Sequence, residues 1–381
     1  KKARKDMPEH KLLLAGAAAL SVAAYAWFRR RSKSCPGIKY SASFQQTMLR
    51  IKDPKRSVAF YEKHFGMRLI HQYDFPQWKF SLYFMERPRD ADVEALPKPG
   101  TPESERYLWS MQGTTIELTH NHGSEMDDSF SVWSGNSGCD MPTTSPLYMK
   151  DGPIRGFGHI AFNVPDVYAI SSSLESSGVR FQKRPDEGRM KGLAFALDPD
   201  GYWIELVKRS DNVTFPEQCN LSQTMMRVKD AQKTIAFYRD VMGMSLVRAM
   251  HVPNDFSNYF LACLTPGQKA SAPDPESAEA REFVKTLWQP VLELTHNHGT
   301  ELDEDFAVHT GNTDPKGFGH IGFLVDDLVE CCDDMAALGV PFHKRPLDGN
   351  MHQIAFALDP SGYRVELVQR NSTFAGVCSN F

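Results

Sequence analysis

The sequence lacks the features that mark disulfide-rich secreted proteins and nucleic-acid-binding proteins. Its seven cysteines include no CxxC pair and no zinc-finger spacing, and Cys331 and Cys332 are adjacent, which favours a reducing compartment. The net charge is only −4, and no long basic block occurs beyond the N-terminus, which argues against a nucleic-acid partner. Hydrophobic content of 41% and charged content of 24% are ordinary for globular proteins, so composition alone indicates no function.

Long uncharged apolar runs are also scarce, and the one that stands out lies near the N-terminus. Leu12 to Phe28 is apolar, follows several lysines and is followed at once by Arg29, Arg30 and Arg31. Its 17 residues are at the short limit for a membrane span, and the arginines resemble a stop-transfer flank rather than a cleavage site. We therefore expect a short hydrophobic helix within residues 1–43 that anchors the protein, with a cleaved presequence as the alternative.

The rest of the chain is a tandem duplication. ELTHNHG occurs at 117–123 and again at 293–299, and QTMLRIKDPKRSVAFYEKHFGM at 46–67 returns in similar form at 223–244. The motifs GFGHI and DP(D/S)GY follow in the same order in both copies. The spacing between copies falls from 177 to 161 residues, which predicts one insertion, a surface loop within 131–152. We expect two domains, at 44–210 and 211–381.

Each copy shows the same pattern of elements twice: a strand, a helix and three strands. We therefore predict an α+β fold with four βαβββ modules. Proline- and charge-rich stretches at 86–105 and 268–282 are predicted as exposed loops. In the first copy the strands are expected at 44–51, 67–73, 80–85, 114–119, 158–164, 179–183, 192–198 and 202–207, and the helices at 54–64 and 167–177.

Four polar residues occupy equivalent places in the modules, on the first or last strand of each. An amide oxygen, an imidazole and two carboxylates without a thiolate suit a divalent ion such as Zn, Ni, Co or Mn. Four protein groups with a remaining water position would make a catalytic metal site. The residues are Gln46, Glu117, His159 and Glu205 in the first copy, and Gln223, Glu293, His320 and Glu366 in the second.

Each motif also has a plainer interpretation. A single glutamate on an amphipathic strand usually faces solvent, and the glycines of GFGH usually let strands approach closely. The histidines and asparagines of the HNH segments more often make loop hydrogen bonds, turns or caps than bind ligands. The repetition of the four landmark residues in the same order favours the metal-site interpretation for them. The plainer interpretation holds for His120, His122, His296 and His298.

QTMLR, ELTHN, RGFGHI and DPDGYWIEL, in this order, resemble glyoxalase I (lactoylglutathione lyase) of the vicinal oxygen chelate superfamily, in its fused two-domain form. The resemblance covers residues 44–370. It implies that the first module of one domain completes a metal site with the second module of the other, as in a dimer, so that the catalytic part is a monomer with an internal pseudo-dimer. The implied sites are Gln46, Glu117, His320 and Glu366, and Gln223, Glu293, His159 and Glu205.

The resemblance also implies the reaction, which turns the hemithioacetal of methylglyoxal and glutathione into S-lactoylglutathione. A divalent metal, Zn first with Ni or Co possible, stabilises the enediolate while a carboxylate moves the proton. The base is Glu366 in one site and Glu205 in the other, with Glu117 and Glu293 across the metal. Dependence on glutathione implies catalytic domains that face the cytosol, or an organelle such as a mitochondrion or plastid.

Basic and polar side chains are expected to hold the glutathione part of the substrate. The family pattern gives Arg50, Asn121, Lys316, Lys344 and Met351 around the first site, and Arg227, Asn297, Arg155, Lys183 and Met190 around the second. The first site has Lys316 where the second has Arg155. Because an ammonium does not bind a carboxylate bidentately as a guanidinium does, we predict weaker binding of the glutathione conjugate at the first site.

Two other functions are less consistent with these residues. An extradiol-type dioxygenase would need a second histidine where the chain has Gln46 and Gln223. A non-catalytic small-molecule binding protein could keep the cleft and lose the base, but the four glutamates are all present.

Overall fold

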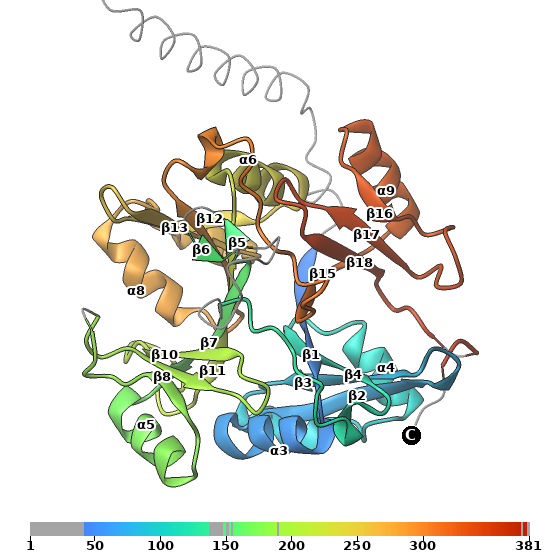
Figure 1. Ribbon diagram of the computed structural model, residues 1–381, viewed down its shortest axis with the longest axis horizontal. Coiled ribbons are helices and arrows are strands. Elements are labelled where there is room, and N and C mark those ends of the chain that lie inside the picture. The colour runs from blue at the N-terminus through green and yellow to red at the C-terminus, as the bar shows by residue number, and fades with distance from the viewer. Residues whose placement is uncertain are drawn as a thin grey trace, which may run out of the picture.

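The computed structural model describes residues 42–136, 148–149, 152–153, 155–188, 190–374 and 376–378. The expected N-terminal helix lies outside these residues, as does most of the expected insertion loop. Within the described part of the chain, no helix is long and apolar enough to cross a membrane. The described residues form two eight-stranded mixed sheets and a small hairpin of β5 (Tyr148–Met149) and β6 (Gly152–Pro153), with the longer helices at the periphery (Figure 1).

The first module follows the predicted order closely. Helix α3 (Pro54–Phe65) begins where Asp53 accepts a hydrogen bond from the Lys55 amide and ends at Gly66, whose φ of 64° is the left-handed conformation that glycine adopts readily. The strands are β1 (Ser43–Ile51), β2 (Arg68–Phe75), β3 (Phe80–Glu86) and β4 (Thr115–Asn121).

The second module also has the predicted order of elements. The helix of the third module is not a regular α-helix throughout. In the third module, helix α6 (Ala231–Ala236) continues into the π-turn η4 (Phe237–Val241). The remaining elements of the second module are β7 (Phe157–Val164), α5 (Val167–Ser176), β8 (Phe181–Lys183), β9 (Ala194–Leu197) and β10 (Trp203–Lys208). Those of the third and fourth are β11 (Asn220–Arg227), β12 (Ser245–His251), β13 (Phe256–Ala262), β14 (Val291–Asn297), β15 (Phe318–Val325), α9 (Leu328–Ala337), β16 (Phe342–Lys344), β17 (Ile354–Leu358) and β18 (Arg364–Gln369).

The two stretches predicted as exposed loops are largely exposed or half-buried, but they contain short helices, so the loop part of this prediction was wrong. Residues 86–105 include the 3₁₀ turn η2 (Asp90–Ala95) and the start of α4 (Pro102–Leu108), and residues 268–282 include parts of α7 (Pro266–Ser271) and α8 (Ala278–Thr286). Pro102 and Pro266 stand at the first helical position of α4 and α7, where a missing amide hydrogen costs little. Thr101 and Thr265 are the N-cap residues of these two helices, and each forms a capping box.

Each sheet combines one module from each copy. One sheet has the order β16-β17-β18-β15-β1-β4-β3-β2, and the other β12-β13-β14-β11-β7-β10-β9-β8. The modules join through the antiparallel pairs β1 with β15 and β7 with β11. The first and fourth modules therefore share a sheet, as do the second and third.

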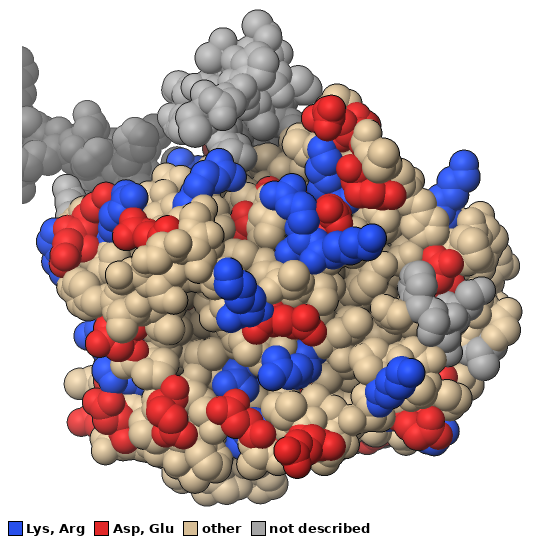
Figure 2. Space-filling view, turned by 90° about the horizontal axis from the view of Figure 1, so that it is seen from below, with Lys and Arg blue, Asp and Glu red and all other residues tan. Residues whose placement is uncertain are grey.

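The two sheets meet around an approximate twofold axis, where equivalent residues of the two copies touch. The rings of Phe157 and Phe318 stack with centroids 5.0 Å apart, and the hydroxyls of Thr47 and Thr224 lie 2.6 Å apart. All eight residues of β7 and of β15 are buried, as expected for central strands covered on both faces. On the face seen in Figure 2, acidic and basic side chains are interspersed.

The first glycine of each GFGH motif permits a close backbone contact between the copies. A Cβ atom on Gly156 would lie 1.8 Å from the carbonyl oxygen of His309, and one on Gly317 would lie 1.8 Å from that of Trp133. Both glycines form isolated bridges with these same residues. The interpretation of these glycines as sites of close approach is therefore confirmed.

Candidate metal centres and substrate cavity

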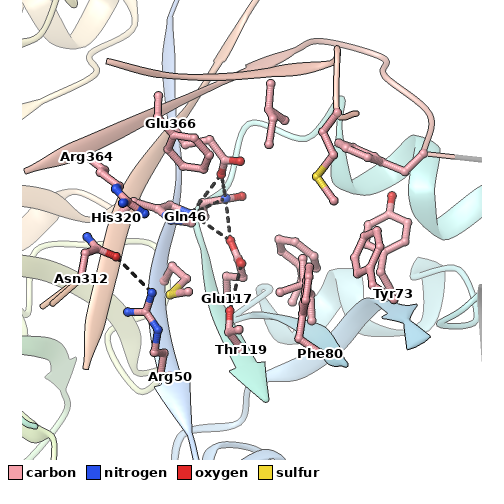
Figure 3. A pocket seen from close by; sticks show the side chains of 18 of the residues that line it. Gln46, Arg50, Tyr73, Phe80, Glu117, Thr119, Asn312, His320, Arg364 and Glu366 are labelled. Carbon is pink, nitrogen blue, oxygen red and sulfur yellow. Dashed lines mark hydrogen bonds and ion pairs between the residues drawn. The ribbon is translucent and has the colours of Figure 1, made fainter. Parts of the chain in front are cut away.

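The first candidate centre is built on four neighbouring strands of one sheet. Gln46 on β1 and Glu117 on β4 come from the first module, and His320 on β15 and Glu366 on β18 come from the fourth. Strands β1 and β4 are parallel neighbours, as are β15 and β18, so the four side chains converge on one face (Figure 3).

The distances in this centre are short. His320 Nε2 lies 3.2 Å from Glu117 Oε2 and 3.0 Å from Glu366 Oε2. Gln46 Nε2 donates to Glu117 Oε2 at 2.7 Å and also to Glu366 Oε2. All four residues are buried.

The second centre repeats this arrangement in the other sheet. His159 Nε2 lies 3.4 Å from both Glu205 Oε2 and Glu293 Oε2, and Gln223 Nε2 donates to Glu293 Oε2 at 2.8 Å. These strands are β7, β10, β14 and β11, so the centre again combines both copies. The family resemblance placed the eight predicted metal ligands in these same two groups.

The electrostatics of both centres indicate a site for a cation. Burial alone would lower the pKa of each histidine, yet the neighbouring carboxylates raise the pKa of His320 and of His159 to about 9. Burial raises the pKa of Glu366 and of Glu293. Two buried carboxylates that face one another remain ionised together only when a positive charge lies between them.

The ligand chemistry of the first centre fits a divalent ion. The Oε1 atom of Gln46 is buried without a hydrogen-bond partner in the structure. Carboxylate oxygens, an imidazole nitrogen and an amide oxygen together form a borderline to hard donor set. Ligand atoms of the two carboxylates and the imidazole lie within 4.8 Å of one another in each centre. Both groups therefore fit one divalent ion apiece.

A cavity of about 330 Å³ adjoins the first centre. Of the predicted contacts, Arg50, Asn121 and Met351 line it, whereas Lys316 and Lys344 do not. The sequence analysis missed Arg364, which lies two residues before Glu366 on the same strand and lines the cavity (Figure 3). It also missed the apolar wall, formed by Tyr73, Phe75, Phe80, Leu82, Phe84, Trp109, Ile354, Phe356 and Phe374.

The spacing of Arg364 and Glu366 was a usable signal, because residues two apart on a strand share a face. Within a strand the wall residues gave the same signal, because Phe80, Leu82 and Phe84 alternate along β3. The sequence did not show that strands from separate parts of the chain meet around one cavity.

Glu105 fixes part of this wall by accepting hydrogen bonds from the Tyr73 hydroxyl at 2.6 Å and from the Phe374 amide at 2.9 Å. Phe374 follows β18, so the C-terminal segment reaches back to the first module.

Several predicted substrate contacts are already engaged in the structure. Arg50 donates to the carbonyl oxygens of Gly317 at 3.0 Å and Phe318 at 3.2 Å, and to Asn312 Oδ1 at 3.0 Å. Arg227 makes the equivalent bond to Asn136 Oδ1 at 2.9 Å. Burial lowers the pKa of Arg227 to about 10.

The two predicted lysines brace loops beside the centres. Lys344 Nζ donates to the carbonyl oxygens of Met351 at 2.6 Å and Ile354 at 3.0 Å. Lys183 Nζ does the same with Met190 at 2.7 Å. The remaining predicted contacts, Asn297, Lys316, Arg155 and Met190, are exposed, as is Asn121 in the cavity lining.

The HNH segments make loop interactions, as their plainer interpretation predicts. His120 contacts Glu125 at 2.7 Å, and His296 contacts Glu301 at 2.8 Å. His298 bonds with the Ser257 hydroxyl at 2.7 Å. None of these histidines belongs to the two metal-capable groups found among the described residues.

Comparison with known proteins extends over most of the chain. The sequence profile of the Glyoxalase/Bleomycin resistance protein/Dioxygenase superfamily matches residues 43–206 and 220–367. The chain is 39% identical over 330 residues to "Glyoxalase I" of Saccharomyces cerevisiae, covering 84% of this chain and 90% of that protein. It is 38% identical over 330 residues to "Lactoylglutathione lyase" of Schizosaccharomyces pombe, covering 85% and 95%.

Solved structures agree at the level of the fold. Glyoxalase I from Zea mays superposes with a TM-score of 0.59 at 24% identity, over 88% of this chain and 94% of that one. The tandem matches, the extent of the identity and the doubled Gln-Glu-His-Glu centre lead to one assignment. The chain belongs to the glyoxalase I family, in its fused two-domain form, within the Glyoxalase/Bleomycin resistance protein/Dioxygenase superfamily.

Proposed function

We propose that the chain is a lactoylglutathione lyase with two active sites, which isomerises the hemithioacetal of methylglyoxal and glutathione to S-lactoylglutathione. One observation supports this above the others: both copies contribute complete, buried Gln-Glu-His-Glu groups, one in each sheet. The names of the yeast relatives support the same activity.

Glu366 in the first site and Glu205 in the second act as the base. The carboxylate takes the proton from the hemithioacetal carbon, and the electron pair moves toward the neighbouring carbonyl. The carboxylate then returns the proton to that second carbon, while the hydroxyl proton of the first carbon passes to the oxygen of the second, so that the first becomes the thioester carbonyl. Atoms and electrons balance, because the reaction only moves hydrogen within the substrate. Burial of Glu366 and Glu205 excludes water that would compete for the proton.

A divalent ion, when bound, stabilises negative charge that develops on the substrate oxygens. Gln46, Glu117, His320 and Glu366 would hold it in the first site, and Gln223, Glu293, His159 and Glu205 in the second. We propose that this ion is zinc. Higher activity with nickel or cobalt than with zinc would assign that metal instead. Glu117 and Glu293 would then lie on the other side of the bound ion from the bases.

The glutathione carboxylates require cationic partners. In the first site Arg364 lines the cavity, while Lys316 is exposed and does not line it. In the second site Trp203 pairs with His159 at the position that Arg364 has beside His320, and Arg155 is exposed. The cations are therefore distributed differently around the two centres.

We further propose that the catalytic part acts as a monomer, since both sheets close within one chain. The domains are those expected at 44–210 and 211–381, and residues 12–28 anchor the chain to a membrane. Cell fractionation of the full chain, compared with a chain that has three lysines inserted in this apolar run, tests the anchor. Release of both chains from membranes by salt alone would contradict it.

The activity is tested with the full chain stripped of metal by a chelator. Formation of the thioester from methylglyoxal and glutathione is followed by absorbance while Zn, Ni or Co is added. Activity restored by about two metal ions per chain, as two sites require, supports the proposal. Metal uptake without turnover would instead favour a non-catalytic binding protein, and no uptake would contradict the metal sites.

A further inference from the structure

The two metal centres differ in how the wall strand holds one of their carboxylates. In the first centre, Thr119 donates its hydroxyl directly to Glu117 Oε1 at 3.2 Å. Leu82, directly opposite Thr119 on β3, adds only apolar surface to the cavity. The Oε2 atom of Glu117 faces His320 and Gln46.

In the second centre, Asn258 occupies the position equivalent to Leu82, opposite Thr295. Its Nδ2 donates to Glu293 Oε1 at 2.6 Å, while its Oδ1 accepts from the Thr295 hydroxyl at 2.9 Å. The hydroxyl thus fixes the orientation of the carboxamide, and the carboxamide fixes the carboxylate. Glu293 Oε2 still faces His159 and Gln223.

We propose that Asn258 is a positioning residue that makes the second centre bind its metal more tightly than the first. A hydrogen bond to a ligating carboxylate limits its rotation, and loss of such a partner commonly lowers metal affinity by about 10-fold to 100-fold. The amide contact of 2.6 Å is shorter than the hydroxyl contact of 3.2 Å, and a second bond anchors it. Bonds to ionised acceptors are the stronger kind.

The proposal rests on the proposed metal sites but not on turnover, because metal affinity is measured without substrate. Each centre is isolated in the full chain: His320→Ala leaves the second centre, and His159→Ala leaves the first. Zinc affinity is measured by competition with a chromophoric chelator. We expect the second centre to have the lower Kd, and Asn258→Leu to raise that Kd by about 10-fold to 100-fold.

The matched control is Leu82→Asn, measured in the chain that retains only the first centre. It places a carboxamide opposite Thr119 and should lower the zinc Kd there. Leucine at 258 copies the residue that the other half already carries, so folding should be preserved, and Thr295→Val supplies a second variant with a smaller expected loss. Equal Kd values at both centres that neither Asn258→Leu nor Thr295→Val changes would overturn the proposal.

Absence of zinc binding at both centres would instead contradict the proposed metal sites themselves. Zinc binding with the expected inequality but no turnover would leave the role of Asn258 standing and remove the proposed activity. The cobalt-loaded protein gives a second reading, since the visible spectrum of cobalt reports ligand geometry. We expect Asn258→Leu to change that spectrum at the second centre only.

Discussion

His71 should make the stability of the protein depend on pH. Its side chain is 0% exposed, Nδ1 lies 2.6 Å from the Ser104 hydroxyl, and Nε2 is buried without a hydrogen-bond partner. Burial lowers the pKa of His71 from 6.5 to about 4, against the opposing charge of Glu105. Below pH 6.5 the unfolded chain therefore takes up a proton that the folded chain refuses.

The sign follows from the lowered pKa. The contribution of neutral His71 to stability is fully present above about pH 6.5 and is lost as the pH falls toward about 4. One pKa unit corresponds to about 1.4 kcal/mol, so about 2 kcal/mol should disappear between about pH 7.5 and about pH 5. Asp198 and Asp359, whose pKa values burial raises to about 7 and about 6, have the opposite effect but are common to wild type and variant.

The assay is urea denaturation of wild type and His71→Gln at both pH values. Glutamine keeps a polar partner for Ser104 and cannot titrate. As the pH falls, the free energy of unfolding of the wild type should decrease by about 2 kcal/mol relative to that of the variant. Replacement of His352, an exposed histidine, by glutamine is the matched control. An unchanged difference between wild type and His71→Gln would refute the reasoning.

Three further predictions concern the sites and the sheet junction. Glu366→Gln and Glu205→Gln should each silence one site and leave the other, whereas the double variant should lose about 100-fold to 10,000-fold in kcat, measured by thioester formation; loss of all activity in either single variant would contradict independent sites. Gly317→Ala places a Cβ 1.8 Å from a backbone oxygen and should cost about 1–3 kcal/mol in urea denaturation. Gly267→Ala, with nothing within 4 Å, is its control, and equal stabilities would refute the close-contact argument. Arg364→Met in the Glu205→Gln background should raise the KM for the glutathione conjugate with little change in kcat, and an unchanged KM would remove Arg364 from substrate binding.

Much of the fold was predictable because the motifs are local. Asp53, Pro54 and Gly66 mark the limits of α3 within a short stretch, and alternating residues mark the strands. The grouping of the metal ligands into two sites could not be predicted from local motifs. Nothing in the order of Gln46 and His320 shows that β1 pairs with β15, and that grouping came from the family resemblance.

The missed features depend on contacts between distant segments or on competing local signals. Phe374 reaches the cavity only because Glu105, 269 residues earlier, binds its amide. Helix α7 was missed because the proline and alanine-rich composition of the stretch hid the threonine cap at 265, and α8 begins after Ser277, whose side chain makes no capping hydrogen bond. Asn258 looked like an ordinary strand residue, since its importance depends on the carboxylate that the neighbouring strand presents beside it.

Fusion of the two copies explains how the two centres could become different. In a dimer of identical chains, each wall position would be the same in both sites, so a change that helps one would alter the other. In the fused chain every position exists twice, and the differences lie around the ligands rather than among them: Leu82 against Asn258, and Arg364 against Trp203. Because each sheet joins modules from both copies, neither half can form a complete site alone. Both sites therefore depend on the folding of one chain, whereas the residues that line each site can change independently.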